Sequence, residues 1–139
     1  MKKIFFILFL IALYSSSVFA YEIVTTDDAM FVFKDSGFQK DSHRYKCVYM
    51  VDEEKGILIS KEEVDLGSGE VYKSDDTVYR ILPLDPDRRF FKKDFLKAMR
   101  INSKTGGIEV IVFCEGKFHY SKVQDEYINL SSGTFEIRK

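Results

Sequence analysis

The apolar residues of this chain are mostly β-branched or aromatic, and this choice restricts the folds that are open to it. Beyond Ala20 the sequence contains nineteen Val and Ile and sixteen Phe and Tyr, but only six Leu and two Ala. Val, Ile, Phe and Tyr suit the pleated surface of a sheet, whereas Leu and Ala are strong helix formers. The composition therefore predicts β-structure over most of the chain.

Short alternating runs between turn residues give the positions of the expected strands. The strongest runs are residues 44–51 and 108–115, and the second has apolar residues on both faces, which is typical of a strand covered on both sides. The weaker candidate strands are residues 21–26, 29–33, 57–61, 70–73, 77–82, 117–123, 126–130 and 134–137. The turns between them, many of which contain glycine, predict antiparallel hairpins and a meander.

One segment departs from the β pattern. Asp85 followed by Pro86 is typical of a helix start, with an N-cap acceptor and then proline at the first helical position. The apolar residues that helical spacing then places on one side are Phe91, Phe95, Ala98 and Met99. We therefore predict an amphipathic helix of about three turns. The expected fold is an α+β domain of mostly antiparallel sheet with this one helix, and the alternative is an all-β sandwich or small barrel.

The first twenty residues have the three parts of a cleavable secretory signal peptide. Lys2 and Lys3 precede an apolar run over residues 4–14, and Val18-Phe19-Ala20 supplies the small-x-small cleavage pattern. The alternative is an uncleaved anchor, but a spanning helix needs about twenty apolar residues. We predict export to the periplasm or the extracellular space. A single β-rich domain is then expected over residues 21–139, with no membrane span after cleavage.

Two cysteines, Cys47 and Cys114, remain after the predicted cleavage. An exported protein meets an oxidising environment, and two cysteines allow only one pairing. We therefore predict a disulfide between Cys47 and Cys114, the alternative being two buried free thiols. The wide spacing of the cysteines argues against a Cys-x-x-Cys redox site.

Charge is nearly balanced over the predicted mature chain but is unevenly distributed along it. Nineteen Lys and Arg against twenty-two Asp and Glu give a formal net charge of −3, so no binding to nucleic acid is expected. The predicted helix would carry a basic stripe, formed by Arg89, Lys93, Lys97 and Arg100. This stripe is a candidate surface for an anionic partner, either an anionic surface or another envelope protein. The alternative is an ordinary solvated helix face.

Few residues suggest catalysis or metal binding. His43 and His119 are the only histidines, and a pair of imidazoles can act as general acid and base if both reach one substrate. Asp85, Asp87 and Asp94 lack the spacing and central glycine of a calcium loop. We therefore expect no catalytic residues, no metal and no cofactor.

These observations favour a small exported, non-catalytic binding or interaction module of the cell envelope. The tyrosines that are candidates for recognition are Tyr45, Tyr49, Tyr72, Tyr79 and Tyr120. One alternative is a small secreted, nuclease-like hydrolase that uses His43 and His119. Another is a structural or assembly component of the envelope that acts through an exposed strand edge.

Overall fold

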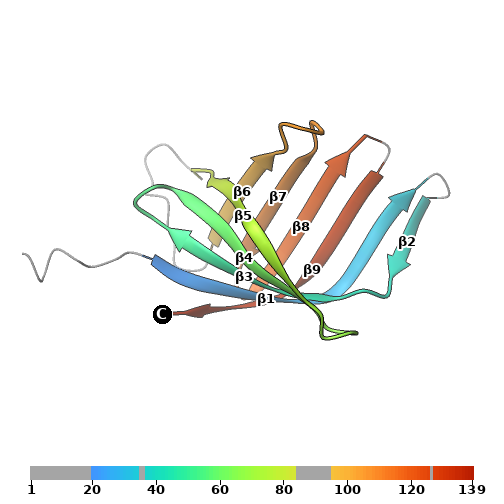
Figure 1. Cartoon of the computed structure of the whole chain (residues 1–139), viewed down its shortest axis with the longest axis horizontal. Helices are drawn as coiled ribbons and strands as arrows, with labels where there is room; N and C mark the ends of the chain where they lie inside the picture. Colours follow the sequence, from blue (N-terminus) through green and yellow to red (C-terminus); the bar gives the residue numbers. More distant parts are fainter. Residues whose placement is uncertain (1–19, 35–36, 84–94, 126) are drawn as a thin grey trace, which may run out of the picture.

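The computed structural model describes residues 20–34, 37–83, 95–125 and 127–139, and these residues form nine strands and no helix (Figure 1). The strands are β1 (Ala20–Lys34), β2 (Gly37–Asp41), β3 (Tyr45–Asp52), β4 (Ile57–Asp65), β5 (Val71–Ile81), β6 (Phe95–Ile101), β7 (Ile108–Cys114), β8 (Lys117–Gln124) and β9 (Tyr127–Arg138). Within this described part, no helix is long and apolar enough to span a membrane. The predicted signal peptide lies outside the described residues except for Ala20.

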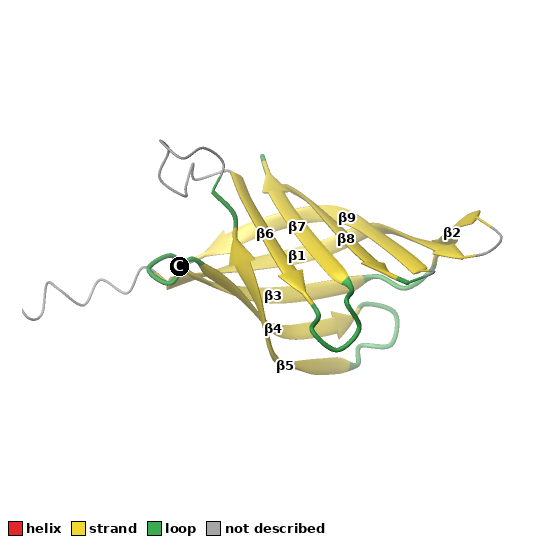
Figure 2. Ribbon diagram, turned by 90° about the horizontal axis from the view of Figure 1, so that it is seen from above, coloured by secondary structure: helices red, strands yellow, loops and turns green. Residues whose placement is uncertain are grey.

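Eight of the strands close into an antiparallel barrel in which almost all neighbours are consecutive in the sequence. The order is β1-β3-β4-β5-β6-β7-β8-β9, and β9 pairs back with β1 over eleven residue pairs to close the ring. β2 lies outside the ring and pairs with the second half of β1, from Met30 to Lys34. Figure 2 shows the barrel from above, with β6 to β9 above the sheet that β3 to β5 form. The α+β prediction is therefore wrong, because the described chain is all-β.

The predicted helix overlaps a strand. Residues 95–101 form β6, which pairs with β7 from Phe95↔Cys114 to Ile101↔Ile108. Leu96 and Ala98 point into the barrel and are 2% and 0% exposed. The apolar residues of this short run satisfy both a helical and a two-residue period, and pairing with β7 decides between the two. The proposed helix start at Asp85 and Pro86 lies outside the described residues.

Three long strands replace six of the shorter strands expected from the sequence. The predicted break at Asp27 and Asp28 is a β-bulge inside β1, where the register shifts against β9. β9 runs unbroken through the predicted turn at residues 131–133, and β5 runs through residues 74–76. Ladder hydrogen bonds to both neighbours hold β1 and β9 extended across sequences that favour turns when isolated.

The apolar core fills the end of the barrel that carries the turns at residues 53–56 and 115–116. Its buried members are Ile23, Tyr49, Val51, Leu58, Tyr79, Ile81, Leu96, Ala98, Ile111, Phe113 and Phe118. Phe113 lies at the centre, with edge-to-face contacts to Tyr49 at 6.1 Å and Phe135 at 5.2 Å between ring centroids. Only one face of β7 belongs to this core, since Ile108 on the other face is 44% exposed. The sequence predicted a strand covered on both faces, but in the structure only the inward face of β7 is covered by the core.

The predicted disulfide is not formed, and both cysteines are free. Cys47 lies on the inward face of β3 with Tyr49 and Val51, whereas Cys114 lies on the outward face of β7, because Ile111 and Phe113 occupy the inward face. Successive side chains of a strand point to opposite sides of the sheet. The barrel wall therefore separates the two thiols.

Candidate functional site

The other half of the barrel interior holds a cavity of about 350 Å³. Its lining comes from the inward faces of six barrel strands and consists of Thr25, Asp27, Met30, Tyr45, Cys47, Tyr49, Ser60, Glu63, Tyr79, Phe118, Tyr120, Lys122, Tyr127, Asn129 and Ser131. Eight-stranded barrels are just wide enough either to be filled by side chains or to hold one small ligand. This barrel is filled by apolar side chains at one end and is hollow and polar at the other.

Two bulges decide which residues reach the cavity. In β4, Ser60 pairs with Tyr49 and Glu63 pairs with Cys47, so an extra residue lies between the two inward positions. A regular strand would instead have turned Glu62 inward. The bulge in β1 has the same effect, because Asp27 and Met30 both line the cavity although they are three positions apart in the sequence.

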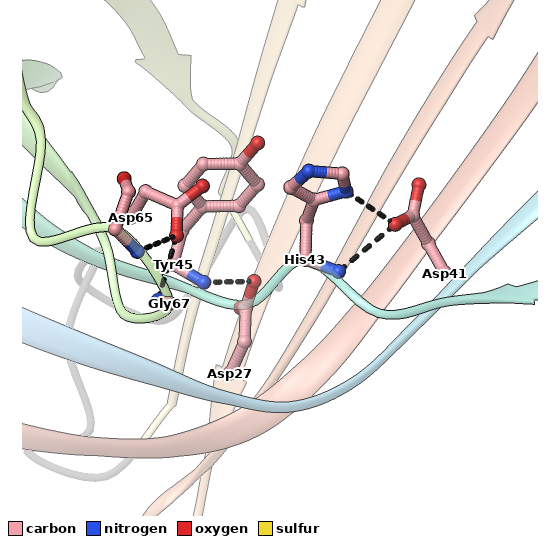
Figure 3. Close-up of polar contacts among 7 residues, drawn as sticks. Asp27, Asp41, His43, Tyr45, Asp65 and Gly67 are labelled. Atoms are coloured by element: carbon pink, nitrogen blue, oxygen red, sulfur yellow. Dashed lines mark hydrogen bonds and ion pairs between the residues drawn. The ribbon is translucent and has the colours of Figure 1, made fainter.

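Asp27 is a buried carboxylate in the cavity wall. It is 6% exposed, and the Ser131 hydroxyl donates a hydrogen bond to Asp27 Oδ1 at 2.6 Å. The backbone N–H of Tyr45 donates to Asp27 Oδ2 at 3.0 Å (Figure 3). Burial raises the pKa of Asp27 even though these two hydrogen bonds oppose the change. The two bonds fix the carboxylate in place between β1, β3 and β9.

Glu63 and Lys122 are the other charged residues of the main cavity. Burial raises the pKa of Glu63, the charges of Asp27 and Asp65 raise it further, and Lys122 acts in the opposite direction. Lys122 Nζ also lies 5.9 Å from the centroid of the Tyr127 ring, within cation–π range. The cavity therefore contains two neighbouring carboxylates and one ammonium group.

A second hollow of about 370 Å³ shares Ser60, Glu63 and Lys122 with the main cavity and adds Arg100 and Glu109. It lies near the shortest seam of the barrel, where β5 and β6 form two ladder pairs, Arg80↔Met99 and Ile81↔Ala98, and the N–H of Leu82 donates to the Lys97 carbonyl at 2.8 Å. The cavity therefore continues toward the side of the barrel between these strands.

Glu109, which lines this second hollow, is 6% exposed and already has partners. The Tyr79 hydroxyl donates a hydrogen bond to Glu109 Oε2 at 2.7 Å, and Arg100 Nη1 lies 3.9 Å from Oε1. The charges of Arg100 and Glu109 thus offset one another inside the barrel. The other charged groups that the described part of the chain contributes to the cavity are Asp27, Glu63 and Lys122.

Two buried oxygen atoms in the cavity wall make no hydrogen bond within the part of the chain that the structure describes. These atoms are Thr25 Oγ1 and Asn129 Oδ1. Thr25 is 1% exposed and interacts with the Cys47 thiol, which is a weak hydrogen-bonding group. Because an unsatisfied buried polar group costs about 1–3 kcal/mol, such atoms are expected to have a partner that the protein itself does not supply.

The rim beside the cavity carries Asp41, His43 and Asp65 (Figure 3). Asp41 Oδ1 lies 2.7 Å from His43 Nδ1 and accepts the backbone N–H of His43 at 2.9 Å. These contacts raise the pKa of His43. Asp65 Oδ1 accepts the backbone N–H groups of Gly67 at 2.7 Å and Ser68 at 3.0 Å, which lowers the pKa of Asp65.

The candidate histidine pair is divided between two surfaces. The His43 side chain is 57% exposed at the rim, whereas His119 is exposed on the outward face of β8, in a shallow outer groove with Phe31 and Leu130. Among the described residues, no group of three or more His, Cys, Asp and Glu is arranged to hold a metal ion. Asp85, Asp87 and Asp94 lie outside the described residues.

The predicted basic stripe is not assembled on β6. Lys97 points outward and Arg100 points inward toward Glu109, because neighbouring positions on a strand face opposite sides. Arg89 and Lys93 lie outside the described residues. The structure therefore does not bring Lys97 and Arg100 to one surface.

Sequence reasoning identified part of the cavity and missed the rest. Four of the candidate tyrosines line the main cavity, namely Tyr45, Tyr49, Tyr79 and Tyr120. Tyr72 is 44% exposed and lines only the second hollow. Asp27, Glu63 and Lys122 were not predicted. Strand alternation could have indicated Asp27 and Lys122, which share faces with Thr25 and Tyr120, but not Glu63, because the β4 bulge shifts the alternation before this residue.

Comparison of the chain with protein-family models, with curated protein sequences and with solved structures found no match. We therefore base the functional proposal on the cavity itself.

Proposed function

We propose that the protein is an exported, non-catalytic binding module that holds one small ligand inside the barrel. One observation carries the proposal, which is that the same eight strands enclose an apolar core at one end and a polar cavity of about 350 Å³ at the other. This volume is within the range of small-molecule sites, about 300–1,000 Å³. Export is inferred from the signal-like sequence of residues 1–20.

The chemistry of the lining supports recognition of a small polar molecule. Tyrosines such as Tyr45, Tyr120 and Tyr127 offer both ring faces and hydroxyl groups at low cost in side-chain entropy. The unsatisfied oxygens of Thr25 and Asn129 offer hydrogen bonds in the wall. A ligand that satisfied them would gain affinity and specificity together.

The groups that could act as nucleophile or base are poorly placed for catalysis. Burial raises the pKa of the Cys47 thiol to about 12, so this thiol stays protonated near neutral pH. Asp27 is held by Ser131 and Tyr45, and His43 is exposed at the rim beside Asp41. These features favour binding over a hydrolase that uses His43 and His119.

Filling the cavity tests the proposal. The protein is purified from its producing cells and analysed by native mass spectrometry for a bound small molecule. A library of neutral, cationic and anionic metabolites is then screened by thermal shift. A ligand at one hundred times its Kd stabilises the folded state by about 2.7 kcal/mol. Ser60→Phe places a ring in the cavity and should abolish the shift, whereas Ile59→Phe, on the outward face of β4, should leave it unchanged.

Either of two results would contradict the proposal. One is the absence of both a bound molecule and a thermal shift across the whole library. The other is a ligand whose affinity is the same for the wild type and for a folded Ser60→Phe variant, because such a ligand would bind outside the cavity.

A further inference from the structure

We propose that the ligand is a compact organic cation with a hydroxyl group, such as an amino alcohol or a quaternary ammonium alcohol. In this assignment the cationic head lies near Asp27, Glu63 and the Tyr45 ring, all of which line one cavity. The inference rests on the binding function proposed above and specifies the chemistry of that same site.

The charge balance of the interior favours a cation. Arg100 and Glu109 offset one another across 3.9 Å. Among the described residues, the remaining charged groups of the lining are Asp27 on β1, Glu63 on β4 and Lys122 on β8, which leave one carboxylate without a matching positive charge. A buried charge is costly unless it is paired, so a ligand that carries one positive charge would complete the balance.

Aromatic rings line the cavity together with these carboxylates. A cation over the face of a tyrosine ring is stabilised by the ring quadrupole, and more strongly where water is excluded. The cavity already shows this arrangement once, because Lys122 Nζ lies 5.9 Å from the Tyr127 centroid. Tyr45 and Tyr120 belong to the same lining and offer further rings to the head of a ligand.

A second and independent observation indicates a ligand with a hydrogen-bonding group besides its charge. Thr25 Oγ1 is buried in the wall, on a residue that is 1% exposed, and among the described residues its one polar contact is with the weakly hydrogen-bonding thiol of Cys47. Asn129 on β9 is half-buried, and its Oδ1 atom is buried and has no hydrogen-bond partner among the described residues. A ligand hydroxyl can donate to one such oxygen and accept from a side-chain hydroxyl or amide, which a simple tetraalkyl cation cannot do.

The electrostatics of the rim support entry of a cation. After burial, the charges of four carboxylates raise the pKa of Tyr45, in the order Glu63, Asp65, Asp41 and Asp27. Two of these acids line the cavity and two lie at the rim. When His43 is protonated, its positive charge offsets the negative charge of Asp41. The resulting negative potential would raise the local concentration of a positively charged ligand.

Calorimetric titration of the purified protein with choline, and with its neutral isostere in which carbon replaces nitrogen, tests the assignment. The two probes share shape and hydroxyl group, so a difference in affinity reports the charge. We expect choline to bind at least about tenfold more tightly, which is the scale of one charge-assisted contact. Equal affinity of the two probes would overturn the cation assignment.

Neighbouring residues of β4 supply a matched pair of variants. Glu63→Gln removes the inward carboxylate and should weaken choline binding about tenfold, whereas Glu62→Gln on the outward face should not change it. Circular dichroism checks that both variants fold. If Glu63→Gln does not fold, Lys122→Met provides the opposite test, because removing the cavity ammonium should strengthen choline binding. Unchanged or weaker binding to a folded Lys122→Met variant would contradict the assignment.

The outcomes separate this inference from the proposed function. A neutral or anionic compound that binds in the cavity, is blocked by Ser60→Phe and is indifferent to the Glu63 charge would overturn the cation assignment and leave the binding function standing. Failure of all compounds, choline included, would overturn both.

Discussion

Gly133 occupies a point where three strands crowd together. A Cβ atom at this position would lie 2.0 Å from the Thr26 carbonyl oxygen, 2.8 Å from Phe118 Cε1 and 2.9 Å from the Asp28 nitrogen. Two of these atoms are backbone atoms at the β1 bulge, where the register shifts after the Asp27↔Gly133 pair. The bulge that lets Met30 follow Asp27 into the cavity wall therefore requires glycine on the opposite strand.

Gly133→Ala should destabilise the barrel strongly for this reason. We expect a loss of about 3 kcal/mol or more in the free energy of unfolding, since backbone must move to admit the methyl group. Gly56→Ala is the matched control. Gly56 has φ +64° but open space around it, so only the conformational cost of about 1 kcal/mol applies. Urea unfolding measures both, and a Gly133→Ala loss no larger than that of Gly56→Ala would contradict the crowding.

At the scale of the element, β6 shows how the strands beside a short apolar run decide its conformation. Its inward residues are Leu96 and Ala98, and its outward residues include Lys97 and Met99. A helix over the same residues would instead place Ala98 and Met99 on one buried side and leave Leu96 off that side. The two arrangements therefore differ in which of Leu96 and Met99 contributes to the core.

Truncation of these two side chains tests the strand. Leu96→Ala should cost about 3 kcal/mol in unfolding free energy, because it leaves a cavity in the filled half of the barrel. Met99→Ala should cost less than about 1 kcal/mol, because Met99 is partly exposed on the outer face. Chemical denaturation gives both values. A larger loss for Met99→Ala than for Leu96→Ala would support the helical register instead.

At the scale of the whole molecule, closure of the barrel separates an interior from an exterior. The two thiols lie on opposite sides of the barrel wall, and both are therefore free. Cys47 lies inside on β3, where burial, and then the charges of Glu63 and Asp27, raise its pKa to about 12. Cys114 lies on the outward face of β7. The protein is therefore held together by its core and its strand ladders, without a covalent link between β3 and β7.

Thiol labelling at pH 8 measures this difference. Cys47 should react slowly in the native protein, since almost none of it is thiolate and it is buried, and Cys114 should react first. Full denaturation without reductant should release two reactive thiols per chain. Cys47→Ser and Cys114→Ser assign the fast and slow phases, and a denatured protein with no reactive thiol would show that the bridge exists.

The sequence by itself determined the strand-rich composition, the turns at residues 53–56 and 115–116, and the shared face of Tyr45, Cys47 and Tyr49. These features are local, because side-chain alternation and turn chemistry depend on a few adjacent residues. For the same reason the sequence identified several cavity tyrosines as candidates, although it did not place them in a cavity.

Only the tertiary structure decided which face of each strand points inward, and hence that Cys114 and Lys97 lie outside while Glu63 and Arg100 lie inside. It also decided that residues 95–101 form a strand and that β1 bulges opposite Gly133. These outcomes depend on pairings between distant segments, above all β1 with β9, which close the barrel. Shifting a strand by one residue reverses every side chain on it, so the polar cavity exists only once the ring is closed in this register.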